Sequence, residues 1–395
     1  MPPPKSRAPY EAYSYLDAGT DYREFKLAKE LGRVPSKEYS LDADQTRRLE
    51  RILATAPVVS SHDHCVVMPD DIREIHEYAR ERRTWTGYAG LAAAGVDIVL
   101  EAFLDGMGGW RWDDVLFDLG MRYSDLAHQD FVYRAETTGD LERAKASGKC
   151  ALVPTLECAT MIEDDVDRID VLYGFGVRVM GITYSESNGL GSGLREERDG
   201  GLTDLGRAAV SRMNKIGMTI DVSHCGDQTS LDTIEASAGP ILITHAGARG
   251  LWNTKRMKPD EVLKRCAAKG GVIGIEAAPH TTLTAKHPRH SIESVMEHVA
   301  YCVELMGIDH VGLGPDTLFG DHVGLHKAFA AALSIARIQK GVTYTPVEYV
   351  DGMESPAEAM PNAARWLVAH GYADADIAKI LGGNVLRVLK ETWAR

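Results

Sequence analysis

The chain has 395 residues, of which 44% are hydrophobic and 26% are charged, a mixture typical of a folded globular protein. Its 44 basic and 57 acidic residues give a net charge of −13, which argues against a nucleic-acid-binding surface. A chain of this length fits either two ordinary domains or one large α/β barrel with added segments.

The sequence lacks targeting and membrane signals. The first fifteen residues contain no apolar signal-peptide core, and no apolar run approaches the ~20 residues that cross a bilayer. The six cysteines include no CxxC pair, so they do not predict a disulfide framework. We therefore expect a cytoplasmic protein with reduced cysteines, and neither a membrane nor a nucleic acid as its partner.

Residues 1–45 are polar, rich in tyrosine and interrupted by prolines, and we interpret them as an N-terminal extension. A helix is predicted over roughly 42–54, with Asp42 or Asp44 as its N-cap and an apolar stripe that includes Leu49. No linker or internal repeat follows, so residues 46–395 are predicted to form a single domain.

Eight short apolar runs, each followed by a helical stretch, predict the fold of that domain. Runs that are apolar on both faces are typical of a parallel sheet covered by helices. Eight such units indicate a (β/α)₈ TIM barrel, an α/β fold, with C-terminal helices added over 325–395. The rival is a doubly wound open sheet, but no GxGxxG motif follows the first run. The runs are 58–61, 96–103, 151–157, 177–184, 219–224, 241–246, 271–277 and 310–316.

Two of the intervening helices carry clear boundary signals. Thr203 or Asp204 can cap a helix that Gly217 ends. Pro259 stands at the first turn of a second helix, which Gly270 ends.

Polar residues gather where the predicted strands end, and catalytic groups of a TIM barrel lie at that edge. Imidazoles and carboxylates are the ligands that Zn²⁺ and similar ions prefer. The sequence therefore predicts a metal site formed by side chains from five strands. The six candidates are His62, His64, Glu157, His224, His245 and Asp316.

The spacing of these residues fits two metal ions. His62 and His64 lie two residues apart on a strand, so both can point to one ion while Asp63 points away. With Glu157 as a bridge, two divalent ions fit, and Zn²⁺ is the expected metal.

The remaining candidate roles complete this hypothesis. His224 and His245 would bind the second ion, and Asp316 would transfer a proton to the leaving nitrogen. His280 is a weaker candidate for the pocket, and His310 opens the last strand at the wrong end for catalysis.

The other histidines and the cysteines beside the candidate ligands are assigned to packing or to the surface. Cys65, Cys158 and Cys225 each follow a candidate ligand, and neighbours on a strand face opposite ways. The histidines assigned in this way are His76, His128, His287, His290, His298, His322, His326 and His370.

From about residue 48 to its end, the chain resembles the membrane (renal-type) dipeptidase family of metallopeptidases, a branch of the amidohydrolase-like barrels. The resemblance rests on GLTDLGRAAVSRMNKIGMTIDVSH (201–224), PILITHAGAR (240–249), RMKPDEVL (256–263), GIDHVGLGPD (307–316) and ILGGNVLRVL (380–389). It implies the metal and proton-transfer roles given above, and it implies that Arg256 binds the substrate carboxylate.

Two positions depart from this family's pattern. The family's first motif is usually His-any-Asp, whereas His64 stands at its last position here. A neutral imidazole in place of an anionic carboxylate raises the net charge of the metal site by one unit. Tyr184 stands where the family has a substrate-contacting histidine, and its hydroxyl can donate a hydrogen bond but cannot carry a positive charge near neutral pH.

The sequence therefore predicts a binuclear metal-dependent hydrolase that cleaves an amide bond of a small carboxylate-bearing substrate, with a dipeptide as the family default. One alternative is a hydrolase of a non-peptide amide, cyclic amide or lactone with the same metal centre. A lyase or decarboxylase step on the same metals and a non-catalytic metal-binding descendant also stay open. The resemblance leaves a homodimer as an option, without a sequence feature that argues for it.

Overall fold

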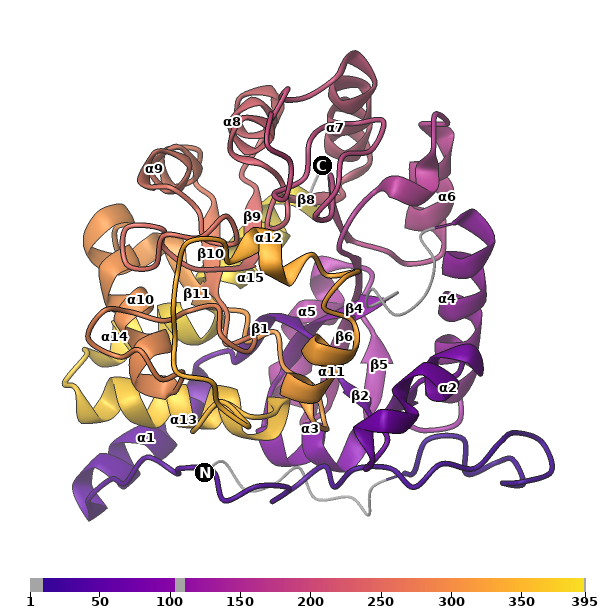
Figure 1. Cartoon of the computed structure of the whole chain (residues 1–395). Coiled ribbons are helices and arrows are strands. Elements are labelled where there is room, and N and C mark those ends of the chain that lie inside the picture. Colours follow the sequence, from indigo (N-terminus) through magenta and orange to yellow (C-terminus); the bar gives the residue numbers. More distant parts are fainter. Residues whose placement is uncertain (1–9, 104–110, 394–395) are drawn as a thin grey trace.

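A computed structural model of the chain describes residues 10–103 and 111–393 (Figure 1). Eight parallel strands follow one another around a barrel in chain order, and every residue in them is buried. Each overlaps one of the eight predicted runs, with β1 extending two residues past its run and β6 starting one residue before its run, so the predicted α/β barrel is confirmed. The strands are β1 (Val59–Asp63), β4 (Ile98–Phe103), β6 (Cys150–Leu156), β7 (Val179–Gly181), β8 (Thr219–Asp221), β9 (Leu242–Ala246), β10 (Val272–Ile275) and β11 (Val311–Leu313).

The barrel closes where the end of β1 meets the segment that follows β11. The Asp316 N–H donates to the His62 carbonyl at 3.0 Å, and the His64 N–H donates to the Thr317 carbonyl at 2.9 Å. The Asp63 carboxylate accepts a further bond from the Thr317 N–H at 2.9 Å. This closure, which we call the seam, therefore lies at the carboxyl ends of the first and last strands.

Helices surround the barrel and cover its outer surface (Figure 1). They are α1 (Ala43–Thr55), α2 (Ile75–Arg80), α3 (Tyr88–Ala94), α4 (Trp112–Leu126), α5 (Thr138–Ser147), α6 (Asp167–Gly174), α7 (Asp204–Ile216), α8 (Asp227–Ala236), α9 (Asp260–Ala268), α10 (Ile292–Met306), α11 (His322–Ala328), α12 (Ile335–Ile338), α13 (Pro356–Ala369), α14 (Asp374–Ala378) and α15 (Asn384–Trp393). In the described ranges 10–103 and 111–393, no helix is long and apolar enough to cross a membrane.

The helix boundaries follow the predicted capping residues. Asp42 caps α1 in a reciprocal capping box with Gln45. Thr203 accepts a hydrogen bond from the N–H of Gly206 at the start of α7, and Gly217 ends that helix with φ +81°. Pro259 stands directly before α9.

Three short strands were not among the predicted elements. β5 (Val132–Arg134) pairs with β6 outside the barrel order, and β2 (Val66–Val67) pairs antiparallel with β3 (Trp85–Thr86). Strands of two or three residues are too short to show periodicity, so contacts between distant parts of the chain decide their formation.

The N-terminal segment runs along one end of the molecule (Figure 1). Tyr13 is buried and its N–H donates to the Asp125 carboxylate at 2.7 Å, while Arg33 forms an ion pair with Glu354. Residues 1–9 of the predicted extension lie outside the described residues, and its boundary at residue 45 stays a prediction.

Gly181 in β7 lets the neighbouring strand end approach closely. A Cβ at this position would lie 2.0 Å from the carbonyl oxygen of Glu157, a contact that the backbone cannot accept without moving. The residue therefore fixes the position of the β6 end, from which the Glu157 side chain projects.

Replacing Gly181 with alanine should lower the free energy of unfolding by about 3 kcal/mol, because overpacking displaces the backbone of Glu157. Gly120 is the control, since it lies on the exposed face of α4 and a Cβ there meets nothing within 4 Å. Gly120→Ala should stabilise by about 0.5 kcal/mol. Urea titration of both variants measures the difference, and equal effects would contradict the account of Gly181.

Candidate metal centre

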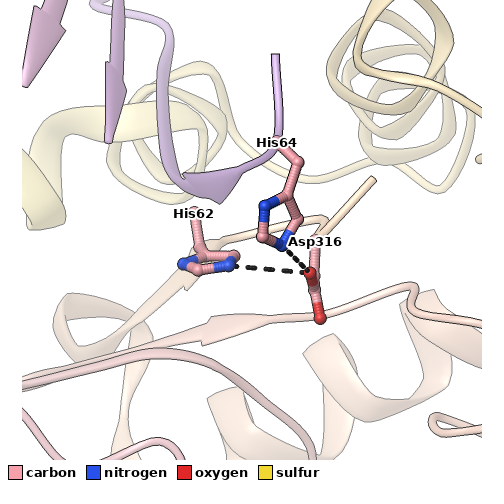
Figure 2. Close-up of side chains that lie close together, drawn as sticks. All are labelled: His62, His64 and Asp316. Atoms are coloured by element: carbon pink, nitrogen blue, oxygen red, sulfur yellow. Dashed lines mark ion pairs between the residues drawn. The ribbon is translucent and has the colours of Figure 1, made fainter. Parts of the chain in front are cut away.

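The first group of candidate ligands lies at the seam. Figure 2 shows His62 and His64 at the end of β1, both directed toward Asp316. The Asp316 Oδ1 atom lies 3.6 Å from His62 Nε2 and 3.2 Å from His64 Nε2. Asp316 has φ +56°, a left-handed conformation that non-glycine residues adopt rarely and often at functional sites.

A second group lies beside the first, at the ends of β6, β8 and β9. The Nε2 atoms of His224 and His245 are 2.9 Å apart. The Oε2 atom of Glu157 lies 3.1 Å from His224 Nε2 and 3.6 Å from His245 Nε2. All three side chains are buried.

Glu157 stands between the two groups. Its Oε2 atom faces His224 and His245, whereas its Oε1 atom lies 4.0 Å from His64 Nε2. The two oxygens of one carboxylate are therefore directed toward different histidines, Oε2 toward His224 and His245 and Oε1 toward His64.

Several polar atoms at this place are buried without a hydrogen bond. Among the described residues, Glu157 Oε1 and His62 Nε2 have no hydrogen-bond partner. Leaving such an atom unsatisfied costs about 1–3 kcal/mol, so buried polar atoms normally have partners. Three sets of ligand atoms lie mutually within 4.8 Å, and two of them contain His62. A divalent cation would satisfy these atoms, so the donor set fits a metal.

Burial and hydrogen bonding favour the protonation states that ligands need. Burial lowers the pKa of His224 and holds that of His245 well below its usual value, which favours neutral imidazoles. Burial alone would raise the pKa of Glu157 and Asp316, but the facing histidines hold the pKa of both carboxyl groups well below the usual range. Neutral imidazoles and ionised carboxylates are the forms that bind metals.

Asp63 points away from the candidate ligands, as predicted. Its carboxylate accepts hydrogen bonds from Ser60 Oγ at 2.5 Å and from Thr317 Oγ1 at 2.7 Å. It therefore belongs to the seam.

The three cysteines beside the ligands are buried and reduced, as predicted. Burial raises the pKa of Cys158 to about 12 and also raises those of Cys65 and Cys225. No cysteine joins a cluster of potential ligands in residues 10–103 and 111–393.

A pocket opens over both groups of ligands, and α11 and α12 contribute one wall. The assignments of three histidines made from the sequence were wrong here. His322 and His326, expected in packing or on the surface, lie one turn apart on α11 and line the pocket. His280 does not line it, because its ring stacks on Tyr344 and its Nε2 accepts a hydrogen bond from the Val347 N–H.

Tyr184 and Arg256 both line this pocket. The Tyr184 ring stacks on His224 with centroids 4.1 Å apart, and burial raises the pKa of Tyr184 well above its usual value, which keeps the hydroxyl protonated. The Arg256 guanidinium donates to the His245 carbonyl at 3.0 Å and forms an ion pair with Glu276.

Glu276 is a residue of this site that the sequence analysis missed. It follows β10 and is fully buried, and its carboxylate belongs to a cluster of potential ligands with His245 and Asp316. Burial raises the pKa of Glu276 to about 7, while the Arg256 guanidinium acts in the opposite direction. Its place at the end of the seventh run was the signal that could have found it.

A family model described as membrane dipeptidase (peptidase family M19) matches residues 46–331. The chain belongs to this family. It is 29% identical over 277 residues to the dipeptidase tcpJ of Claviceps purpurea, a match that covers 69% of this chain and 58% of that protein. It is 27% identical over 271 residues to an uncharacterized protein in the pqqA 5′ region of Klebsiella pneumoniae, a match that covers 65% of this chain and 88% of that protein. The chain thus spans less than two thirds of the length of the Claviceps dipeptidase.

Solved structures share the fold of this chain. An amidohydrolase from Pseudomonas aeruginosa has a TM-score of 0.73 and 24% identity, with 88% of this chain and 99% of that chain covered. A metallo peptidase from Rhodobacter sphaeroides, liganded with a phosphinate mimic of the dipeptide L-Ala-D-Ala, has a TM-score of 0.66 and 19% identity. That match covers 86% of this chain and 100% of that chain. These likenesses concern the fold.

His64 and Asp63 are neighbours that should respond oppositely to substitution. If His64 is a metal ligand, as predicted, His64→Asn should lower the affinity for Zn²⁺, the expected metal, at least about tenfold, because the variant loses that nitrogen. Asp63→Asn should retain the metal of the unaltered protein, since the Asp63 carboxylate points away from the candidate ligands and is bonded to Ser60 and Thr317. Metal content after chelation and reconstitution, measured by mass spectrometry, tests both. Equal metal content in the two variants would contradict the assignment of His64.

Proposed function

We propose that this chain is a metal-dependent hydrolase with a binuclear centre that cleaves an amide bond of a small substrate, as a dipeptidase does. The position of Glu157 carries the proposal. One of its carboxylate oxygens faces His224 and His245, and the other lies 4.0 Å from His64 Nε2. Membership in the membrane dipeptidase family supports the same reaction class.

In this proposal, His62 and His64 would hold one ion, His224 and His245 would hold the other, and Glu157 would be shared between them. Two divalent cations, with Zn²⁺ as the expected metal, would polarise the scissile carbonyl and lower the pKa of water to about 7. The neutral imidazoles and the ionised bridge described above suit this role.

Asp316 is proposed to hold and move the proton. It lines the pocket beside His62 and His64 and is ionised, so it can accept a proton from the attacking water. It would then deliver that proton to the departing nitrogen. The backbone bond from Asp316 N–H to the His62 carbonyl holds the carboxylate in place.

Tyr184 and Arg256 are proposed to position the substrate. The protonated Tyr184 hydroxyl can donate a hydrogen bond to the oxygen on which negative charge develops. Arg256 reaches the pocket from the segment before α9, where its guanidinium is fixed by the His245 carbonyl. A dipeptide is the default substrate, and a non-peptide amide, cyclic amide or lactone is the alternative.

Replacing Asp316 with asparagine should lower kcat at least about 100-fold on the best substrate of a dipeptide and amide panel, because the proton carrier is lost. Metal content should stay unchanged. Asp309→Asn is the control, since Asp309 is exposed and paired with Lys379 at the surface. Loss of metal in Asp316→Asn would assign Asp316 as a ligand, and unchanged kcat would contradict its proposed role.

Tyr184→Phe should lower kcat about 100-fold while leaving metal content and folding intact, because only the hydroxyl donor is removed. The pH profile of the remaining activity should keep its shape, since the raised pKa of Tyr184 keeps its hydroxyl protonated over the assay range. Steady-state kinetics between pH 6 and about pH 9 measure this. A changed alkaline limb would show that Tyr184 titrates instead.

A further inference from the structure

The arginine side chain that lines the pocket already forms an ion pair within the protein. Arg256 is the arginine that lines the pocket, and its guanidinium is bound to the Glu276 carboxylate and the His245 carbonyl. Its Nη1 atom lies 3.4 Å from the Ser223 carbonyl. Both members of the ion pair are buried, so solvent screens their interaction only weakly.

A substrate carboxylate placed against Arg256 would meet two carboxylates of the protein. Ligand atoms of Glu276, Asp316 and His245 lie within 4.8 Å of one another. An incoming carboxylate would have to compete with Glu276 for one guanidinium, and like charges at such distances in a buried site repel strongly. A neutral carbonyl oxygen could accept a hydrogen bond from the same guanidinium without this repulsion.

The wall that α11 and α12 contribute carries apolar side chains beside His322 and His326. Leu325 and Phe329 come from α11 and the residue after it, and Ile335 and Ile338 come from α12. Leu333 lies between the two helices and lines the same pocket. Burial of a hydrocarbon group of the substrate against these side chains would therefore be favourable.

We propose that Glu276 is a specificity-determining residue: by pairing with Arg256, it makes this pocket select substrates that present a neutral carboxamide or ester to Arg256, together with an apolar side chain. The inference rests on the proposed function and names the substrate class within it. The reaction is hydrolysis, in which water adds a hydroxyl to the acyl carbon and a proton to the leaving nitrogen as the C–N bond breaks.

A pair of substrates that differ by one charge tests this selection. The zinc-loaded enzyme is given alanyl-leucine and alanyl-leucinamide, and release of alanine is followed by mass spectrometry. We expect kcat/KM for the amide to exceed that for the acid at least about tenfold, the effect of about 1.4 kcal/mol. Preference for the free carboxylate would overturn the inference.

Glu276→Gln tests the residue itself, and Glu354→Gln is its matched control. Glu354 is also a buried glutamate paired with an arginine, but that arginine, Arg33, does not line the pocket, whereas Arg256 does. Glu276→Gln should shift the amide-to-acid ratio at least about tenfold toward the acid, because Arg256 becomes available to an anion. Glu354→Gln should leave the ratio unchanged. A ratio unaltered by Glu276→Gln would also overturn the inference.

A binding measurement separates failure of this inference from failure of the proposed function. Calorimetry compares N-acetyl-leucine with N-acetyl-leucinamide on the same zinc-loaded proteins, and it needs no turnover. If neither peptide is cleaved but the amide binds more tightly, the proposed reaction fails and the selection stands. If the peptides are cleaved and the acid is preferred, the reaction stands and the selection fails. Should Glu276→Gln not fold, the preference of the unaltered enzyme decides.

Discussion

The pairing of the first barrel strand with the segment after the last one is the constraint on which the site depends. Two backbone hydrogen bonds join His62 and His64 to the segment containing Asp316 and Thr317. They close the barrel and also fix the distance between two candidate ligands and the candidate proton carrier. The Asp63 carboxylate strengthens the same seam from the opposite face of the strand. Fold closure and site geometry are therefore one set of contacts.

Burying so many ionisable groups in one place is unfavourable unless each has a partner. Around the candidate metal centre the ionisable groups are partners of one another: each carboxylate faces imidazole nitrogens or a guanidinium. A second buried pair, Arg122 with Glu101, follows the same principle away from the pocket. Glu157 Oε1 and His62 Nε2 stay without a partner within the described part of the chain, which is where a cation would complete the arrangement.

The barrel and most of the candidate site were predictable because both depend on local sequence patterns. Buried parallel strands need apolar runs, and the residue that ends such a run points to the catalytic edge, which is how His224, His245 and Glu157 were found. The short strands β2, β3 and β5 were missed because their pairing depends on distant segments. His322 and His326 were misassigned because α11 begins after the last strand, where no strand end marks the pocket. The pairing of Glu276 with Arg256 joins two βα units, and a single sequence shows neither its distance nor its burial.

The seam also has a consequence for the order in which the protein can be made. Asp63 and Thr317 are 254 residues apart in the chain, yet they bond directly to each other. A ribosome must therefore deliver the eighth strand before the two histidines of the first strand meet their partner. Until then, an emerging chain holds unpaired strand edges and an incomplete set of ligands, a state that is prone to aggregation. A metal site that uses ligands from both ends of the barrel would therefore be complete only after the last strand has been synthesised.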